Sequence, residues 1–328
     1  MTVPLVSVVI PTYRRPDLLL RCLGAVLAQA FHGRSYEVVV VDDGHDDATR
    51  DAVQALQPTV PPQVTLRYLR PPTGRGPAVA RNAGWRAAQA TLIAFTDDDT
   101  LPAPGWLAEG WAAMAAEPGW SAASGAVRVP PAEDPPTDHE RMTRGLETAE
   151  FVTANAFVRK PALQAIDGFD ERFLRAWRED SDLQFRLQRE VGPVGRAAQA
   201  EVVHPVRPER WGVCLRQQRN AFFDALLYKK HPTLYRARIG PLAPLTYYLI
   251  VGCTLLALPL AWAVGPAAGA IAVGIAALGI VSVAVRRLRG TSRRPAHVVE
   301  MLVTSALIPF LSVYWRLRGA WHFQVLFV

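Results

Sequence analysis

Short apolar runs alternate with longer amphipathic stretches through the first two hundred residues of the chain. The apolar runs predict strands, and the stretches between them, in which apolar positions recur every three or four residues, predict helices. The predicted strands cover residues 5–10, 36–41, 64–69 and 92–95, and the predicted helices cover 17–29, 47–56, 78–90 and 106–116. Regular strand–helix alternation is typical of a mostly parallel sheet with helices on both faces, so the sequence predicts an α/β fold.

The last third of the chain differs, because long uncharged runs replace the alternation. Residues 242–264 and 267–285 carry no charged side chain, and Gly265-Pro266 separates them. A helix over the first run would be about 35 Å long, enough for a hydrocarbon core of about 30 Å. A third apolar run, 298–315, contains an acid and a proline, so the sequence leaves open whether this run crosses the membrane. The sequence predicts membrane helices within 241–328, with a buried helical hairpin as the alternative.

Charge is distributed unevenly between these two parts. Residues 1–206 carry 21 Lys and Arg against 26 Asp and Glu, a net charge of −5, whereas residues 207–328 carry 15 against 3, a net charge of +12. The basic residues flank the apolar runs, which favours anionic lipid headgroups over nucleic acid as a partner. Arginines lie at both outer ends of the first two runs, and no signal peptide is visible. We therefore expect a multi-pass protein of the cytoplasmic membrane whose first domain stays in the cytoplasm.

A basic connection, 207–240, joins the two parts. Within it, residues 211–230 combine apolar and basic positions at helical spacing. This pattern predicts either an amphipathic helix on the membrane surface or a helix packed on the first domain. The predicted organisation is a globular domain over 1–206, this connection, and the membrane helices over 241–328.

Two predicted strands end directly in clustered aspartates. Val41-Asp42-Asp43-Gly44 follows one strand, and Thr96-Asp97-Asp98-Asp99 follows another. Ligands of open α/β sheets bind at the carboxyl edge of the strands, where both clusters would lie. Clustered carboxylates repel one another unless a cation or donors stabilise them, and they suit hard cations such as Mg²⁺ or Mn²⁺. The pattern favours a site for a metal-chelated diphosphate over ordinary acidic turns.

Three further segments carry candidate side chains. The first strand runs into Pro11-Thr12-Tyr13-Arg14, which offers a ring for a base and a guanidinium for phosphate, or else only opens a helix. The glycine-rich loop 74–84 opens a helix that carries Arg81 and Asn82, which would reach an anion or lie on a solvated surface. The helix beginning at Arg178-Glu179-Asp180-Ser181-Asp182 has more acids than capping requires, so one could act as a general base.

These motifs, in this order, resemble those of the family-2 glycosyltransferases of the GT-A fold. The matching stretches lie within about residues 5–190 and read SVVIPTYRRPDLL, VVVVDDG, GPAVARNAGWRAA, IAFTDDDT, TANAFVRK, DGFDERF and REDSDLQFRL. The resemblance implies a Rossmann-like nucleotide-diphospho-sugar transferase fold. It also implies an inverting, metal-dependent transfer of a sugar from a UDP-, GDP- or dTDP-linked donor to an acceptor hydroxyl.

The resemblance assigns roles by position. Asp42 or Asp43 would meet the base or the ribose, Asp97 and Asp99 would be the outer acids of a DxD motif that holds Mg²⁺ or Mn²⁺, and Asp180 would be the catalytic base. The donor nucleotide would be held by Pro11, Thr12, Tyr13, Arg14, Asp42, Asp43, Arg81, Asn82, Asp97 and Asp98. The acceptor side would be formed by Glu179, Asp182, Phe169 and Asp170, and His204, whose alternative is a structural role, is a further candidate metal ligand.

One departure from the family pattern narrows the expected activity. Processive members carry Gln-x-x-Arg-Trp after the base, whereas the nearest match, Arg216-Gln217-Gln218-Arg219-Asn220, lacks both the Gln and the Trp. We therefore expect non-processive transfer to a lipid-linked or membrane-proximal acceptor in cell-envelope glycan or glycolipid synthesis. One alternative is a sugar nucleotidyltransferase, although its glycine-rich first loop is absent from 11–15. Another is a non-catalytic membrane scaffold, against which the intact Asp97, Asp99 and Asp180 count.

Overall fold

The computed structural model describes residues 3–71, 73, 75–132, 134–240 and 244–327. The first two residues of the predicted run 242–264, and Gly74 of the glycine-rich loop, lie outside the described residues. Contacts between residues divide the chain into two compact units. The first comprises Met1–Pro130 and Arg144–Pro205, and the second comprises Pro131–Thr143 and Val206–Val328.

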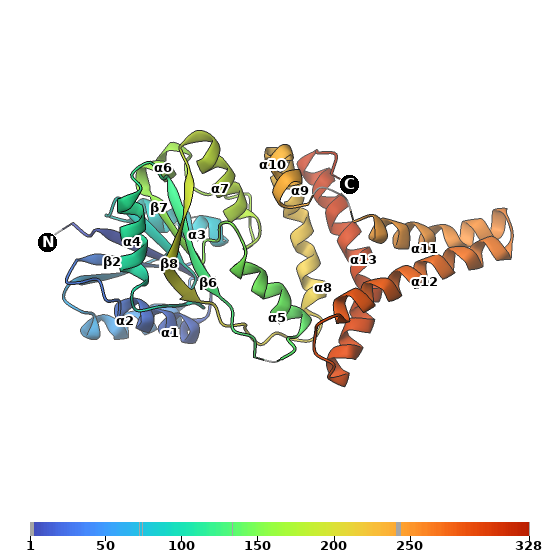
Figure 1. Cartoon of the computed structure of the whole chain (residues 1–328), viewed down its shortest axis with the longest axis horizontal. Coiled ribbons are helices and arrows are strands. Elements are labelled where there is room, and N and C mark those ends of the chain that lie inside the picture. The colour runs from blue at the N-terminus through green and yellow to red at the C-terminus, as the bar shows by residue number, and fades with distance from the viewer. Residues whose placement is uncertain (1–2, 72, 74, 133, 241–243, 328) are drawn as a thin grey trace. The chain divides into compact units, whose positions relative to one another are not determined.

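The first unit is built on a mixed sheet that is parallel over its N-terminal half (Figure 1). Its described strands are β1 (Val6–Thr12), β2 (Tyr36–Asp42), β3 (Val64–Leu69), β4 (Leu92–Thr96), β5 (Leu101–Pro102), β6 (Ala122–Arg128), β7 (Asn155–Arg159) and β8 (Val194–Val203), in the spatial order β3-β2-β1-β4-β7-β6-β8-β5. The four predicted strands become β1 to β4 and run parallel, so the predicted fold class is confirmed. β7 runs antiparallel to both β4 and β6, and β5 to β8.

Helices cover this sheet because its central strands are apolar on both faces. They are α1 (Pro16–Leu27), α2 (Asp47–Leu56), α3 (Pro77–Ala87), α4 (Trp106–Ala116), α6 (Lys160–Ala165) and α7 (Glu179–Glu190), with 3-10 turns at Gln57–Thr59 and Arg144–Glu147. α3 packs on β1 and β2, and α4 packs on β6 and β8. Gly84 permits a close approach of α3 to the sheet, since a Cβ there would lie 2.4 Å from Cγ1 of Val9. This packing places the side chains of α3 beside the carboxyl edge of the sheet.

The second unit is helical, and its last three helices are long and apolar. It contains α5 (Asp138–Thr143), α8 (Val213–Gln217), a 3-10 turn (Gln218–Asn220), α9 (Ala221–Lys230), α10 (Pro232–Arg238), α11 (Leu245–Ala263), α12 (Pro266–Leu288) and α13 (Pro295–Phe323). Among the described residues, α11, α12 and α13 are the helices long and apolar enough to cross a membrane (Figure 1). Large apolar side chains such as Leu258, Trp262 and Leu278 are exposed on them. Apolar surface of this extent is typical of sites that associate with a membrane or with another protein.

Small residues and buried polar contacts hold these helices together. A Cβ at Gly269 of α12 would lie 2.6 Å from the Cβ of Ala261, so the glycine lets α12 approach α11 closely. Glu300, the acid within the third apolar run, accepts the backbone N–H of Gly212 at 2.7 Å. This hydrogen bond connects α13 to the residue that precedes α8, and α13 extends beyond the predicted run 298–315 at both ends.

The segment 131–143 belongs to the second unit although it lies between β6 and β7 in the chain. Asp138 forms an ion pair with Arg287 of α12 at 2.8 Å, and Pro136 accepts the N–H of Ser292. The predicted amphipathic stretch 211–230 forms α8, a 3-10 turn and α9. Phe222 of α9 packs against the ring of Phe323 on α13. The stretch is therefore packed on α13, a contact that neither sequence-based alternative contained.

Candidate active site

Both aspartate clusters lie at one edge of the sheet, because β1 separates the two strands that carry them. Thr12 of β1 pairs in register with Asp42 of β2, and Val9 of β1 pairs with Phe95 of β4. All three strands are parallel, so the residues that follow them emerge at the same carboxyl edge. The site is built on this edge, with α3 and the start of α7 supplying further side chains.

A cavity of about 320 Å³ lies beside the first cluster. It is lined by Tyr13, Arg14, Asp43, Gly44, His45, Pro71, Thr73 and Arg75. Oδ2 of Asp43 accepts the N–H of Gly76 at 2.8 Å, while its Oδ1 is buried and has no hydrogen-bond partner among the described residues. A buried acceptor without a donor is costly unless a ligand supplies one. The half-exposed ring of Tyr13 adds an aromatic face, so the cavity suits a nitrogenous base with its ribose.

Asp42 has a different environment from its neighbour. It is fully buried, and its carboxylate accepts the N–H groups of Gly44 and Asp46 and the hydroxyl of Tyr68 at 2.6–2.9 Å. It therefore shapes the loop after β2 and has no free face toward the cavity. Of the two residues that sequence reasoning left open, Asp43 is the one that lines the cavity.

The second cluster forms a three-residue site together with His204. Asp97, Asp99 and His204 each offer one ligand atom, and these atoms all lie within 4.8 Å of one another. Nε2 of His204 is 3.6 Å from Oδ1 of Asp99. Two carboxylates and an imidazole are suitable ligands for a divalent cation, and Mn²⁺ accepts this mixed set readily. Although burial favours the protonated form, the charges of Arg81 and His204 hold the pKa of Asp97 below its ordinary value. The donor set thus fits a divalent cation.

Asp98, between the two outer acids, faces into the protein. It accepts the hydroxyl of Thr12 at 2.7 Å and forms an ion pair with Arg15 at 2.8 Å. Burial raises the pKa of Asp98 to about 6, against the opposing charge of Arg15. Its contacts fix the loop after β4 to the loop after β1. Asp98 and Thr12, both predicted at the donor nucleotide, therefore contact each other, and Asp98 is also held by Arg15.

A buried ion-pair bridge connects the cluster to the start of α7. Arg81 donates to Asp97 at 2.8 Å and to Glu179 at 3.1 Å. Burial raises the pKa of Glu179 to about 8, with a further contribution from Asp180 and an opposing one from Arg81. Burial also raises the pKa of Asp180, while the N–H of Ser181 lowers it. A carboxylate whose pKa is raised is a better proton acceptor near neutral pH.

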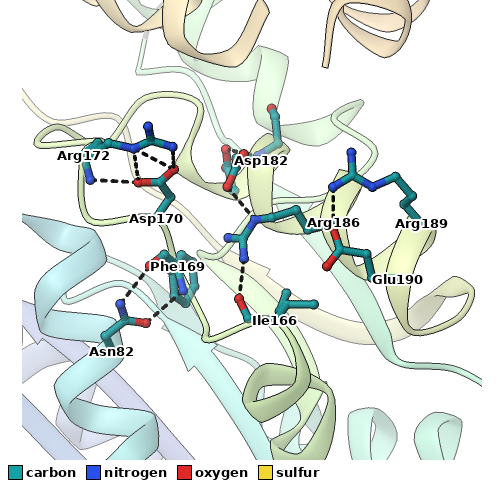
Figure 2. A network of polar contacts seen from close by, with 11 residues as sticks. Asn82, Ile166, Phe169, Asp170, Arg172, Asp182, Arg186, Arg189 and Glu190 are labelled. Carbon is teal, nitrogen blue, oxygen red and sulfur yellow. Dashed lines mark hydrogen bonds and ion pairs between the residues drawn. The ribbon is translucent and has the colours of Figure 1, made fainter. Parts of the chain in front are cut away.

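Of the expected acceptor-side residues, Phe169 and Asp170 lie on a turn that contacts α3, and Glu179 and Asp182 belong to α7. Figure 2 shows the contacts around the turn. Asn82 of α3 accepts the N–H of Phe169 and donates to its carbonyl, both at 2.9 Å. Asp182 pairs with Arg186 at 2.8 Å, and Arg186 donates to the carbonyl of Ile166. Phe169 is buried, and Asp170 pairs with Arg172 at 2.6 Å. These contacts make Asn82, Asp182 and Phe169 parts of the frame that holds the turn.

Sequence reasoning missed several residues of the site. Thr73 and Arg75 line the nucleotide-sized cavity from the loop after β3, and Arg15 reaches both Asp98 and Asp99. Arg15 is the last residue of the predicted motif at 11–15 but was not assigned a role there, so its position offered a signal. Arg75 belongs to the glycine-rich loop 74–84, which offered a signal, whereas Thr73 precedes that loop and only the tertiary fold brings it to the cavity.

The sheet with its acidic carboxyl edge defines a GT-A fold. The solved structure of mannosyltransferase PcManGT from Pyrobaculum calidifontis, in complex with GDP-Man and Mn²⁺, superposes with a TM-score of 0.60. The superposition covers 98% of this chain and 88% of that chain at 21% sequence identity. At this identity the likeness establishes the shared fold.

The family follows from the sequence comparison. The family model described as Glycosyl transferase family 2 matches residues 7–170, and the model described as Glycosyl transferase family group 2 matches residues 92–281. The chain belongs to glycosyl transferase family 2, as the motifs predicted.

Curated relatives match parts of the chain. Validoxylamine A glucosyltransferase from Streptomyces hygroscopicus subsp. limoneus is 44% identical over 103 residues, which are 31% of this chain and 22% of that protein. Pre-mycofactocin glycosyltransferase from Mycobacterium tuberculosis (strain CDC 1551 / Oshkosh) is 30% identical over 198 residues, 56% of this chain and 38% of that protein. The chain thus spans well under half of the length of these two relatives.

Proposed function

We propose that this protein is a metal-dependent, inverting glycosyltransferase that moves a sugar from a nucleotide-diphosphate sugar to an acceptor hydroxyl. The observation that carries the proposal is the Asp97–Asp99–His204 cluster, which fits a divalent cation and is bridged through Arg81 to the acidic start of α7. The cavity beside Asp43, with its unsatisfied carboxylate oxygen, supplies a place for the base and ribose at the same sheet edge.

The chemistry needs one base in this arrangement. Asp180 accepts the proton of the acceptor hydroxyl, and the resulting oxygen nucleophile forms the new bond to the anomeric carbon as the bond to the diphosphate breaks, which inverts that carbon. When bound, Mg²⁺ or Mn²⁺ neutralises the charge that develops on the leaving diphosphate, so no second carboxylic acid is needed. Asp97, Asp99 and His204 would hold the cation. The raised pKa of Asp180 suits proton acceptance.

We further propose that the acceptor is lipid-linked or membrane-proximal and that the protein is a multi-pass protein of the cytoplasmic membrane. Three long apolar helices support the membrane location, and arginines at the outer ends of α11 and α12 support a cytoplasmic catalytic domain. The incomplete match at Arg216–Asn220 to the processive motif supports one or a few transfers rather than polymer synthesis.

The direct test uses the full chain in detergent or nanodiscs. UDP-, GDP- and dTDP-linked sugars are screened by thermal shift and by release of nucleoside diphosphate, with Mn²⁺, with Mg²⁺ and with chelator. GDP-mannose with Mn²⁺ comes first, because the structural neighbour was solved with that pair. We expect one donor to stabilise the protein only when metal is present, and chelator to abolish transfer.

Asp99→Asn tests the metal assignment, because it removes one carboxylate ligand while preserving volume. We expect loss of Mn²⁺ binding and of transfer. Asp51→Asn is the matched control, since Asp51 is an exposed acid on α2 whose ion-pair partner among the described residues is its neighbour Arg50. Full activity of the Asp99→Asn protein in chelator would contradict metal dependence.

A further inference from the structure

Arg81 is a buried charge at the centre of the site. Its side chain is 3% exposed, as is that of Glu179, so water does not screen the pair. Burying a guanidinium is unfavourable unless carboxylates and hydrogen bonds compensate it. Two acidic side chains accept hydrogen bonds from Arg81, each from a different nitrogen. Nη2 donates to Oδ1 of Asp97, and Nη1 donates to Oε1 of Glu179.

The two partners come from different elements of the fold. Asp97 follows β4, and Glu179 begins α7, next to the candidate base Asp180. The guanidinium is planar and rigid, so two bonds from its two ends fix the separation of the groups they reach. The next residue of α3, Asn82, holds the turn at Phe169 in the same way (Figure 2). One helix thus ties the candidate metal carboxylate and the acceptor-side turn to a common support.

This environment leaves Arg81 unsuited to contact the donor. Both terminal nitrogens are engaged by protein carboxylates, and Nε is buried without a hydrogen-bond partner among the described residues. The charge of Arg81 is already matched by that of Asp97, so no surplus positive charge remains for a diphosphate. Arg14 and Arg75, in contrast, line the nucleotide-sized cavity.

We propose that Arg81 is a positioning residue, which sets the metal carboxylate Asp97 relative to the base Asp180 through Glu179 and does not bind the donor. The inference rests on the proposed function, since it takes the roles of Asp97 and Asp180 from it. It changes the role of Arg81 from donor binding, which the sequence predicts, to coupling between the two halves of the site.

The decisive variant is Arg81→Lys, which keeps the buried charge but replaces a two-ended fork by a single ammonium. Lysine can satisfy either carboxylate but cannot hold both in plane. We expect single-turnover transfer to fall by about 10²-fold, the scale on which a small misplacement of reacting groups acts. The affinity for Mn²⁺ in the presence of nucleoside diphosphate, measured by electron paramagnetic resonance, should fall as well. Nucleoside diphosphate affinity in chelator should stay within a few-fold of wild type.

Two further variants isolate the coupling. Glu179→Ala leaves a neutral Arg81–Asp97 pair and removes the link to α7, so it should slow transfer without weakening metal-free nucleotide binding. In the double variant Arg81→Lys/Glu179→Ala, the loss of transfer rate should be smaller than the product of the two single losses, because both substitutions act on the same bridge. Arg86→Lys is the matched control on the same helix, since Arg86 pairs with Asp167 and Glu171 at the surface. It should behave as wild type.

Several results would overturn the inference. Equal loss of metal-free nucleotide affinity and of transfer in Arg81→Lys would make Arg81 a donor contact. Wild-type rates in Arg81→Lys or Glu179→Ala, or additive losses in the double variant, would show that no coupling passes through the bridge. If Arg81→Lys does not fold, the result for Glu179→Ala decides alone. Failure of the proposed function is a separate outcome, because the wild-type protein would then bind no nucleotide sugar and transfer none.

Discussion

Neighbouring carboxylates in this site differ in what they contact, and the contacts separate their roles. Asp97 and Asp99 converge on His204, whereas Asp98 between them is turned inward to Thr12 and Arg15. The same separation holds at the start of α7, where Asp180 is partly exposed and Asp182 is fully buried against Arg186. These neighbouring acids look equivalent in the sequence. Their contacts in the structure distinguish them.

The pair Asp180→Asn and Asp182→Asn should therefore fail in different ways. Asp180→Asn removes proton acceptance, so single-turnover transfer should fall by about 10²–10⁴-fold while donor affinity changes only a few-fold. Asp182→Asn leaves Arg186 with less charge compensation in a buried setting and should lower the free energy of unfolding by about 3 kcal/mol. Transfer kinetics and denaturant unfolding measure the two effects. A dead but stable Asp182→Asn protein beside an active Asp180→Asn protein would move the base to Asp182.

Glu179 should make the stability of the metal-free protein depend on pH. Its pKa rises from 4.5 in the unfolded chain to about 8 in the fold, so its favourable contribution is complete below pH 4.5 and is lost as the pH rises toward 8. The glutamine of Glu179→Gln cannot ionise, so this variant does not lose that contribution as the pH rises. The free energy of unfolding of Glu179→Gln minus that of wild type should therefore increase between pH 5 and 8. The slope cannot exceed about 1.4 kcal/mol per pH unit for one proton. Urea unfolding in chelator measures it, with the exposed Asp167→Asn as a control, and a pH-independent difference would refute the expectation.

At the scale of elements, α3 determines the geometry of the site. It approaches β1 and β2 closely enough that Gly84 admits no side chain, and one turn earlier it carries Arg81 and Asn82. The bonds from these two residues reach β4, α7 and the turn at Phe169. A displacement of this one helix would therefore move both Asp97 and the turn at Phe169.

Gly84→Ala should show this dependence. The added Cβ would lie 2.4 Å from Val9 and 3.0 Å from Val41, so the helix must shift, with a destabilisation of about 1–3 kcal/mol and slower transfer. Gly24→Ala is the matched control in α1, where a Cβ meets nothing within 4 Å. Alanine there should stabilise the protein by about 0.5–1 kcal/mol through helix propensity. Thermal unfolding compares the two, and equal effects would refute the close-packing argument.

At the scale of the whole molecule, the chain joins a GT-A unit to a unit with three long apolar helices. The chain passes between the two units after Pro130, after Thr143 and after Pro205, so the catalytic fold is joined to the helical unit at three points. The segment 131–143 is held in the helical unit by the Asp138–Arg287 pair, which is mostly shielded from water. A membrane location of the helical unit, as proposed, would therefore also tether the catalytic unit to the membrane through these three connections.

Cysteine labelling tests the predicted topology of α11 and α12. In a background with the three native cysteines replaced by serine, Val264→Cys reports the turn between the helices and Arg289→Cys reports the far end of α12. Both positions are exposed, and neither has a positive φ. A membrane-impermeant maleimide should label residue 264 in intact cells, and residue 289 only after lysis. The reverse pattern would place the catalytic unit outside the cytoplasm.

The sequence by itself determined the elements with a clear local pattern, because helical and strand periodicities reflect which face of a segment is buried. These patterns predicted β1 to β4, the long apolar helices, and the acidic residues that follow β2 and β4. Only the tertiary structure determined which residues distant in the sequence contact one another. Arg81 meets Asp97 and Glu179, which are 16 and 98 residues away, and no local pattern encodes such a choice. The antiparallel direction of β7 and the transfer of 131–143 to the helical unit were likewise set by long-range packing, which selects among pairings that local propensity leaves equal.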